Sequence, residues 1–228
     1  MRHSHRRPLA LVYRGGGATL PGCAESVAAL LAHSRWNFDV RYVGPHEDLP
    51  LAPDVLRSAA VYAQPGGDEL RPAWRRMRRH RHTVREYVAG GGRYLGFCLG
   101  GYLAGATPGF NLLPADADRY ISTARSEVAG PEATVVDVRW RGRPQPMYFQ
   151  DGPTFQLPRY FPPGMHVLAA YTNGQVAALT SRFGDGRVGV VGPHPEADGD
   201  WFADSGLPTP VDVGTAAGLD LIDAVMTP

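Results

Sequence analysis

Cys98 stands in a sequence pattern that suits a catalytic nucleophile. An apolar run ends directly before it, and Leu-Gly-Gly follows it. A sharp strand-to-helix turn needs small residues because another backbone passes close to the strained nucleophile, which accounts for Gly96, Gly100 and Gly101. The positive end of the following helix favours the reactive thiolate. We interpret Cys98 as a candidate nucleophile, with a buried structural cysteine as the alternative.

The segment GPHPEAD at residues 192–198 supplies the base that such a cysteine needs. Alternate side chains of an extended chain point to the same side, so Glu196 is expected beside His194. The carboxylate would then orient the imidazole while the imidazole faces Cys98. Asp198 is a second candidate for the orienting role, and a surface histidine in a proline-rich loop is the alternative for His194.

A glycine turn follows the strand-like segment YAQP. In an open parallel sheet, the loops at the carboxyl ends of the strands gather around one crevice. The amides of Gly67 and Leu99 are therefore candidates for an oxyanion hole, in which each donor commonly contributes roughly 3 kcal/mol. Gly66 and Asp68 of the same turn are candidate substrate contacts. An ordinary β-turn is the alternative.

Hydrophobic periodicity predicts the elements that must position these residues. Strands alternating with helices imply a parallel sheet. Strand-like runs between residues 120 and 190, separated by turns, predict a hairpin-rich and largely antiparallel C-terminal half. We predict an α/β fold with a mostly parallel central sheet flanked by helices, flavodoxin-like, in one domain at 9–228 after a flexible tail at 1–8. Strands are expected at 9–13, 40–43, 59–63 and 92–97, and helices at about 23–32, 71–88 and 213–225.

Composition excludes several classes of protein. The 23 basic residues are all Arg, so there is no lysine for a pyridoxal phosphate Schiff base, a P-loop or biotin attachment. The formal net charge of +1 gives no global attraction to nucleic acid or anionic membranes. Two cysteines are too few for a disulfide scaffold and lack zinc-site spacing, which indicates a reducing, cytoplasmic setting. We find no signal for a membrane span, a metal or a cofactor.

Two further segments are candidates for binding. The loop RGGGAT lacks the spaced glycines of a dinucleotide site, and we interpret Gly16 as part of a substrate-shaping loop. The helix expected at 71–88 carries seven arginines between Arg71 and Arg85. A solvated face is the simplest interpretation, and docking of an acidic protein partner is the alternative. Nucleic acid is not favoured, because Trp74 and Tyr87 are expected on the apolar side of the helix and not among the arginines, where they could stack on bases.

The chain resembles the class I glutamine amidotransferase-like superfamily, and within it the N-terminal domain of the large biotin-protein ligases. The resemblance rests on VYRGGG, YAQPGGDEL, YVAGGGRYLGFCLGGYLAG, MYFQDGPTF and VGVVGPHPE, which occur in that order. It implies a Cys98–His194–Glu196 triad with the oxyanion hole near Gly67 and Leu99. It also places the hairpin residues Tyr148, Gln150 and Asp151 near the site.

One residue departs from the pattern of the glutamine-hydrolysing enzymes. Those enzymes usually carry Gly-X-Cys-X-Gly-X-Gln, and the Gln position is Tyr102 here. We therefore expect a cysteine-dependent hydrolase or amidotransferase-like enzyme that acts on a carboxamide or acyl group of a small-molecule or peptide-like substrate through a Cys98 thioester. A non-catalytic ligand-binding or regulatory module with the same fold is the alternative. The sequence leaves the oligomeric state open.

Overall fold

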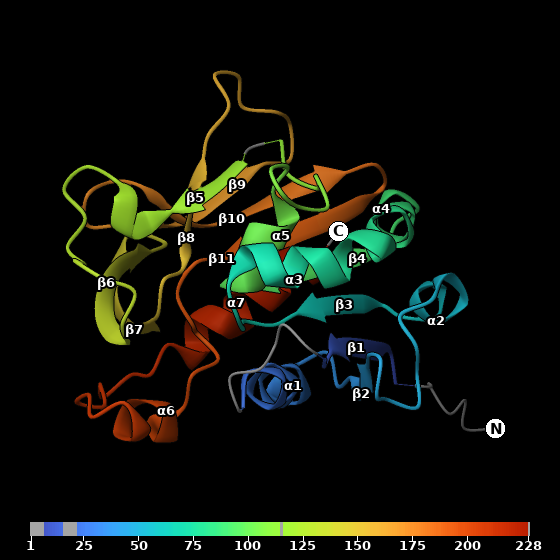
Figure 1. The fold of residues 1–228 in the computed structure, drawn as a ribbon, viewed down its shortest axis with the longest axis horizontal. Helices are drawn as coiled ribbons and strands as arrows, with labels where there is room; N and C mark the ends of the chain where they lie inside the picture. Colours follow the sequence, from blue (N-terminus) through green and yellow to red (C-terminus); the bar gives the residue numbers. More distant parts are fainter. Residues whose placement is uncertain (1–6, 16–21, 115, 228) are drawn as a thin grey trace.

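One mixed sheet of 11 strands forms the centre of the protein (Figure 1). The computed structural model describes residues 7–15, 22–114 and 116–227. The main strand order is β2-β1-β3-β4-β11-β10-β9-β6-β7, while β5 pairs with β8, and β8 also pairs with β10. This arrangement confirms the predicted α/β fold. The proposed tail at 1–8 lies mostly outside the described residues.

The first half of the sheet is parallel, as predicted. Its strands are β1 (Leu9–Tyr13), β2 (Asp39–Val43), β3 (Val61–Gln64), β4 (Arg93–Phe97) and β11 (Gly186–Val191). Both faces are covered, and successive strand residues therefore enter different cores. One core includes α1 (Cys23–His33) and α7 (Thr215–Met226), and the other includes α2 (Pro53–Arg57), α3 (Leu70–Met77), α4 (Arg81–Ala89) and α5 (Leu99–Ala104).

The second half of the sheet is antiparallel, which confirms the hairpin-rich prediction. It consists of β5 (Asp116–Arg119), β6 (Thr134–Trp140), β7 (Arg143–Phe149), β8 (Pro153–Gln156), β9 (His166–Tyr171) and β10 (Val176–Phe183). Strand β11 joins the two halves because it pairs in parallel with β4 and antiparallel with β10. It therefore places the segment that follows it beside the end of β4.

The prediction of one continuous helix at 71–88 is wrong. Helices α3 and α4 are separated by a 3-10 turn at Arg78–His80. This turn buries no side chain, whereas Met77 before it and Val84 after it are buried. Without an apolar residue to anchor it, the middle of the predicted helix follows a tighter path. The sequence interpretation also did not identify α2, β5, β8, the 3-10 turn Tyr120–Ser122 or α6 (Gly199–Asp204).

The glycines around Cys98 are needed for close backbone packing, as the sequence predicted. A Cβ on Gly100 would lie 2.0 Å from the carbonyl oxygen of Gln64 at the end of β3. A Cβ on Gly96 would lie 2.5 Å from the carbonyl oxygen of Gly100. The turn therefore packs directly on the neighbouring strand.

We expect Gly100→Ala to destabilise the protein by about 3 kcal/mol, because overpacking against backbone cannot be relieved by a side-chain rotation. Alanine would otherwise favour a helix at this position. Thermal unfolding should show a fall in Tm of about 6–12 °C. Gly199→Ala is the control, since the nearest atom to its Cβ would be Thr209 Cγ2 at 3.9 Å. Equal Tm values for the two variants would contradict the packing argument.

Candidate active site

Cys98 occupies a strained turn between β4 and α5. Its backbone angles are φ 47° and ψ −104°, a conformation that residues other than glycine rarely adopt. Its N–H donates to the carbonyl oxygen of Val191 at 2.9 Å, which attaches the turn to β11. Such strain persists only where surrounding structure holds it, and it is concentrated at functional sites. The strand-to-helix turn predicted from the sequence is therefore present.

His194 and Glu196 form a buried hydrogen-bonded pair. His194 Nδ1 donates to Glu196 Oε1 at 2.8 Å, and the two residues are 1% and 6% exposed. The backbone N–H of His194 donates to the carbonyl oxygen of Tyr148 at 2.8 Å. Asp198 does not share the orienting role, because it accepts hydrogen bonds from the N–H groups of Asp200 and Trp201 as the N-cap of α6. The extended segment thus places Glu196 as expected.

The charge on His194 depends on its two neighbours. Burial by itself disfavours the positive ring. Charge interactions with Cys98 and Glu196, together with hydrogen bonds to both side chains, outweigh burial and hold the pKa of His194 well above its ordinary value of 6.5. The arrangement can therefore hold a proton on the imidazole next to a sulfur nucleophile.

Aromatic rings enclose His194, and Trp201 among them was not identified from the sequence. The Trp201 ring lies 5.1 Å from the His194 ring, and Trp201 Nε1 donates to Ser26 Oγ at 3.2 Å. Tyr148 lies edge-on to His194 at 5.9 Å, and its hydroxyl hydrogen-bonds to Ser205 at 2.8 Å. The structure thus brings Tyr148 to the site, in contact with the candidate base His194. Trp201 follows the His-Pro-Glu segment closely in sequence, and that proximity was the available signal.

Gly66 lies against the base. A Cβ there would be 2.7 Å from His194 Cε1 and 3.6 Å from Cys23 Sγ. The loop after β3 therefore needs glycine at this position so that the imidazole can keep its place.

We expect Gly66→Ala to slow iodoacetamide alkylation of Cys98 at pH 7 by about 10- to 100-fold, because a displacement of a positioned group by an ångström can cost that much. Peptide mass spectrometry measures the rate. Gly199→Ala, whose Cβ would make only an ordinary contact with Thr209 Cγ2 at 3.9 Å, should react like the wild type. If Gly66→Ala also reacts like the wild type, the glycine does not determine the position of His194.

The loop between β7 and β8 lies against Cys98. The hairpin expected at MYFQDGPTF is wrong, because β7 pairs with β6, whereas β8 pairs with β5 and β10. Cys98 Sγ lies 3.6 Å from the carbonyl oxygen of Gln150, and the Tyr102 hydroxyl donates to the carbonyl oxygen of Asp151 at 3.1 Å. Burial raises the pKa of Tyr102 well above its ordinary value, so the phenol stays neutral. The carboxylate of Asp151 is paired with Arg119 at 2.6 Å. The structure therefore gathers Tyr102, Gln150 and Asp151 near the sulfur, as expected.

The candidate oxyanion donors lie at the ends of two adjacent elements. Leu99 is the first residue of α5, so its N–H has no acceptor within the helix. Gly67 follows Gly66 on the loop after β3. The carboxylate of Asp68 on that loop lies 3.9 Å from Arg76. Gly16, predicted to shape the substrate site, lies outside the described residues.

Cys23 is a second thiol near the candidate base. It is fully buried at the start of α1, and its Sγ lies close to Gly66. Burial, followed by the charges of Glu196 and Cys98, raises the pKa of Cys23 well above its ordinary value. Both cysteines are free thiols, and Cys23 is suited to packing rather than to attack.

The arginine surface between Arg71 and Arg85 is largely exposed, and its binding role stays a prediction. Arg85 is an exception, since it donates to the carbonyl oxygens of Phe110 and Asn111 and lies over the Phe183 ring.

No helix in the described part of the chain is long and apolar enough to cross a membrane. Nor do three or more His, Cys, Asp or Glu side chains gather there as a metal site would require.

Comparisons with known proteins support the resemblance predicted from the sequence. Residues 9–118 match the family model described as "Biotin-protein ligase, N terminal". No curated protein matches the chain. The matched segment includes β1, the turn after β3, and the Cys98 turn.

Solved structures show the same fold. A glutamine amidotransferase from Thermotoga maritima is 14% identical with a TM-score of 0.60, and the match covers 97% of each chain. A candidate GMP synthase component from Thermoplasma acidophilum is 14% identical with a TM-score of 0.58, and the match covers 97% of this chain and 94% of that one. An exo-β-1,4-mannosidase from Opitutaceae bacterium strain TAV5 is 18% identical with a TM-score of 0.55, over 97% of this chain and 36% of its own. The chain has the class I glutamine amidotransferase-like fold.

Proposed function

From this amidotransferase-like fold and the link to the N-terminal domain of biotin-protein ligases, we propose that the chain is a cysteine-dependent hydrolase or amidotransferase-like enzyme. Its substrate is a carboxamide or related acyl compound, either a small molecule or peptide-like. The observation that carries the proposal is the buried His194–Glu196 pair beside a strained cysteine at a helix N-terminus.

In the first step, Cys98 Sγ attacks the carbonyl carbon of the substrate. The C–N bond breaks, and protonated His194 gives its proton to the leaving amine, so a thioester and a neutral amine result. Glu196 keeps the imidazole in the required orientation through Nδ1. The N–H groups of Leu99 and Gly67 are the proposed donors to the oxyanion that forms transiently.

In the second step, His194 takes a proton from water, and the hydroxide attacks the thioester carbon. The C–S bond breaks, and the carboxylic acid leaves and loses its proton to the solvent. The Cys98 thiolate and the protonated His194 are thereby restored. An amine in place of water would give amide transfer by the same route. This sequence requires only groups of the described chain and the substrate.

Tyr102 supports a substrate other than free glutamine. The phenol is buried and hydrogen-bonded at the position where glutamine-hydrolysing relatives carry an amide side chain. The Tyr102 hydroxyl already donates its one proton to Asp151, so Tyr102 offers a substrate an acceptor and an apolar face, whereas a Gln side chain offers both donors and an acceptor. We therefore propose a substrate whose carboxamide or acyl group is attached to a side chain or body that is less polar than that of free glutamine.

The proposal is tested by incubating the protein with primary carboxamides, glutamine included, and measuring ammonia release together with the intact mass. Turnover and an acyl adduct on Cys98 are expected, and Cys98→Ala should lose both. Cys23→Ala should retain both, because Cys23 takes no part in the mechanism. If a ligand binds Cys98→Ala and wild type equally and neither protein turns it over, the chain is a binding or regulatory module instead.

We also propose a cytoplasmic location. The support is chemical: both cysteines are free thiols, and the mechanism needs Cys98 to stay reduced.

A further inference from the structure

Three arginines form a lateral row across the sheet, at the strand ends opposite those that lead to Cys98 and His194. Arg182 on β10 lies opposite Arg187 on β11, and Arg187 is in register with Arg93 on β4. Residues in register on adjacent strands project to the same face of a sheet. The three guanidinium groups of this arginine row therefore share one edge of the protein.

The arginine row has no direct carboxylate partner in the described part of the chain. Among the residues that the structure describes, none of the three arginines forms a salt bridge. Arg93 Nε is buried and has no hydrogen-bond partner there. Like charges directly opposite each other destabilise a strand pair, and a buried donor without a partner costs free energy. An anion over the row would relieve the repulsion between the facing arginines.

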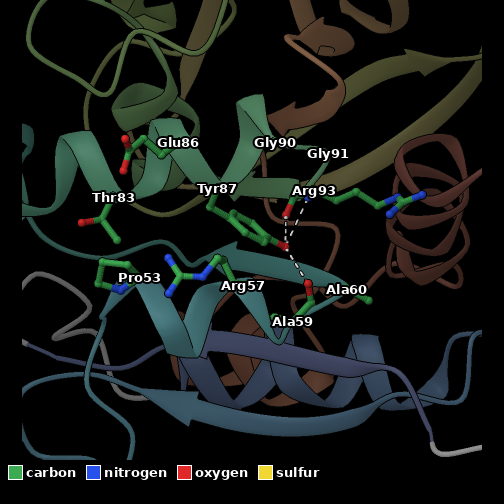
Figure 2. A pocket seen from close by; sticks show the side chains of 11 residues that line it. Pro53, Arg57, Ala59, Ala60, Thr83, Glu86, Tyr87, Gly90, Gly91 and Arg93 are labelled. Carbon is green, nitrogen blue, oxygen red and sulfur yellow. Dashed lines mark hydrogen bonds between the residues drawn. The ribbon is translucent and has the colours of Figure 1, made fainter.

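Two adjoining cavities open at this edge. The smaller, about 290 Å³, is lined by the arginine row together with Asp185 and glycines 91 and 186. The larger, about 340 Å³, shares Gly91 and Arg93 with it and adds Arg57, Thr83 and Glu86. Figure 2 shows Arg57 between Pro53 and Tyr87, while the Arg93 side chain extends away on the other side of Tyr87. The larger cavity has the size of a small-molecule site.

Charge in these cavities favours an anionic ligand. Arg57, Arg93, Arg182 and Arg187 are opposed by Glu86 and Asp185. Glu86 lies 3.0 Å from His82, with which it forms an exposed pair. Guanidinium groups bind phosphate through paired N–H donors, and several of them together suit a group that carries more than one negative charge.

We propose that this edge binds a phosphorylated small molecule. Its phosphate lies over the arginine row in the smaller cavity, and its organic portion occupies the larger cavity beside Arg57 and Thr83. The site is separate from the triad, because β4 and β11 begin at the arginine row and end before Cys98 and His194.

Isothermal titration calorimetry with inorganic pyrophosphate tests the proposal. Saturable binding is expected, and Arg187→Gln should weaken it about tenfold or more, because hydrogen bonds to a charged group are lost. Arg139→Gln is the matched control, since Arg139 is an exposed strand arginine on β6 outside both cavities. Cys98→Ala should bind pyrophosphate like the wild type.

Arg182→Gln gives a second, independent result. Without added anion it should raise Tm by about 1–3 °C, because it removes one of two facing positive charges. With pyrophosphate it should show less stabilisation than the wild type. Binding that does not saturate, or that is equally strong in Arg139→Gln and Arg187→Gln, overturns the site. Equal affinity for citrate overturns the assignment to phosphate.

Discussion

Iodoacetamide at pH 7 is expected to label Cys98 and to leave Cys23 unmodified. Cys23 is fully buried, and that burial raises its pKa, so it has little thiolate to react. At Cys98 the neighbouring His194 carries a positive charge that favours the thiolate. In general, a thiol beside a cationic group can react up to roughly 30-fold faster at pH 7 than an ordinary thiol, of which only about 3% is ionised.

His194→Ala should therefore slow alkylation of Cys98 by about tenfold or more at pH 7. The rates of the variant and of the wild type should converge near pH 10, where any accessible thiol is ionised. This convergence separates loss of charge from damage to the fold. His166→Ala, at an exposed histidine on β9, is the control and should change nothing. Labelling of both cysteines at similar rates would remove the main support for a catalytic Cys98.

Glu196→Gln is expected to reduce turnover by about 100- to 10,000-fold with little change in the fold. Glutamine can keep a hydrogen bond to Nδ1, but it removes the charge that stabilises the protonated ring. The charge of Glu196 no longer offsets burial, so the pKa of His194 should fall, while Cys98 continues to favour the protonated ring. Asp198→Asn is the matched control, since Asp198 caps α6 and does not contact the imidazole. Steady-state ammonia release with a substrate identified by the carboxamide screen measures the effect.

The same variant should weaken one pH dependence of stability and shift it to lower pH. In the wild type the pKa of His194 is raised in the folded state, so the stability that it contributes is fully present below pH 6.5 and is lost as pH rises through the folded pKa. In Glu196→Gln the pKa of His194 is raised less, so the ring contributes less stability at low pH and that contribution is lost at a lower pH than in the wild type. Imidazole NMR titration and thermal unfolding between pH 5 and about 9 measure both quantities. An unchanged His194 titration would contradict the role given to Glu196.

The sequence by itself determined the fold class and identified the residues that we propose for the site. Apolar runs separated by helical stretches indicated the parallel half, and turn residues indicated the antiparallel half. The glycines around Cys98 are required because the Gln64 backbone passes close to them. Such a requirement can be recognised from the residue types next to the cysteine. The same is true of His194 and Glu196, which lie two residues apart on an extended segment and hydrogen-bond as expected.

Only the tertiary structure decided which residues surround these groups. The choice of Glu196 over Asp198 depended on where α6 begins, and the packing of Trp201 and Gly66 around His194 depended on loops from distant segments. The arginine row joins residue 93 to residues 182 and 187 through strand register. Register is set by the burial of whole strand faces in two cores, which couples residues far apart in the chain. No local sequence pattern indicates this coupling. The proposed anion site can therefore be recognised only in the folded sheet.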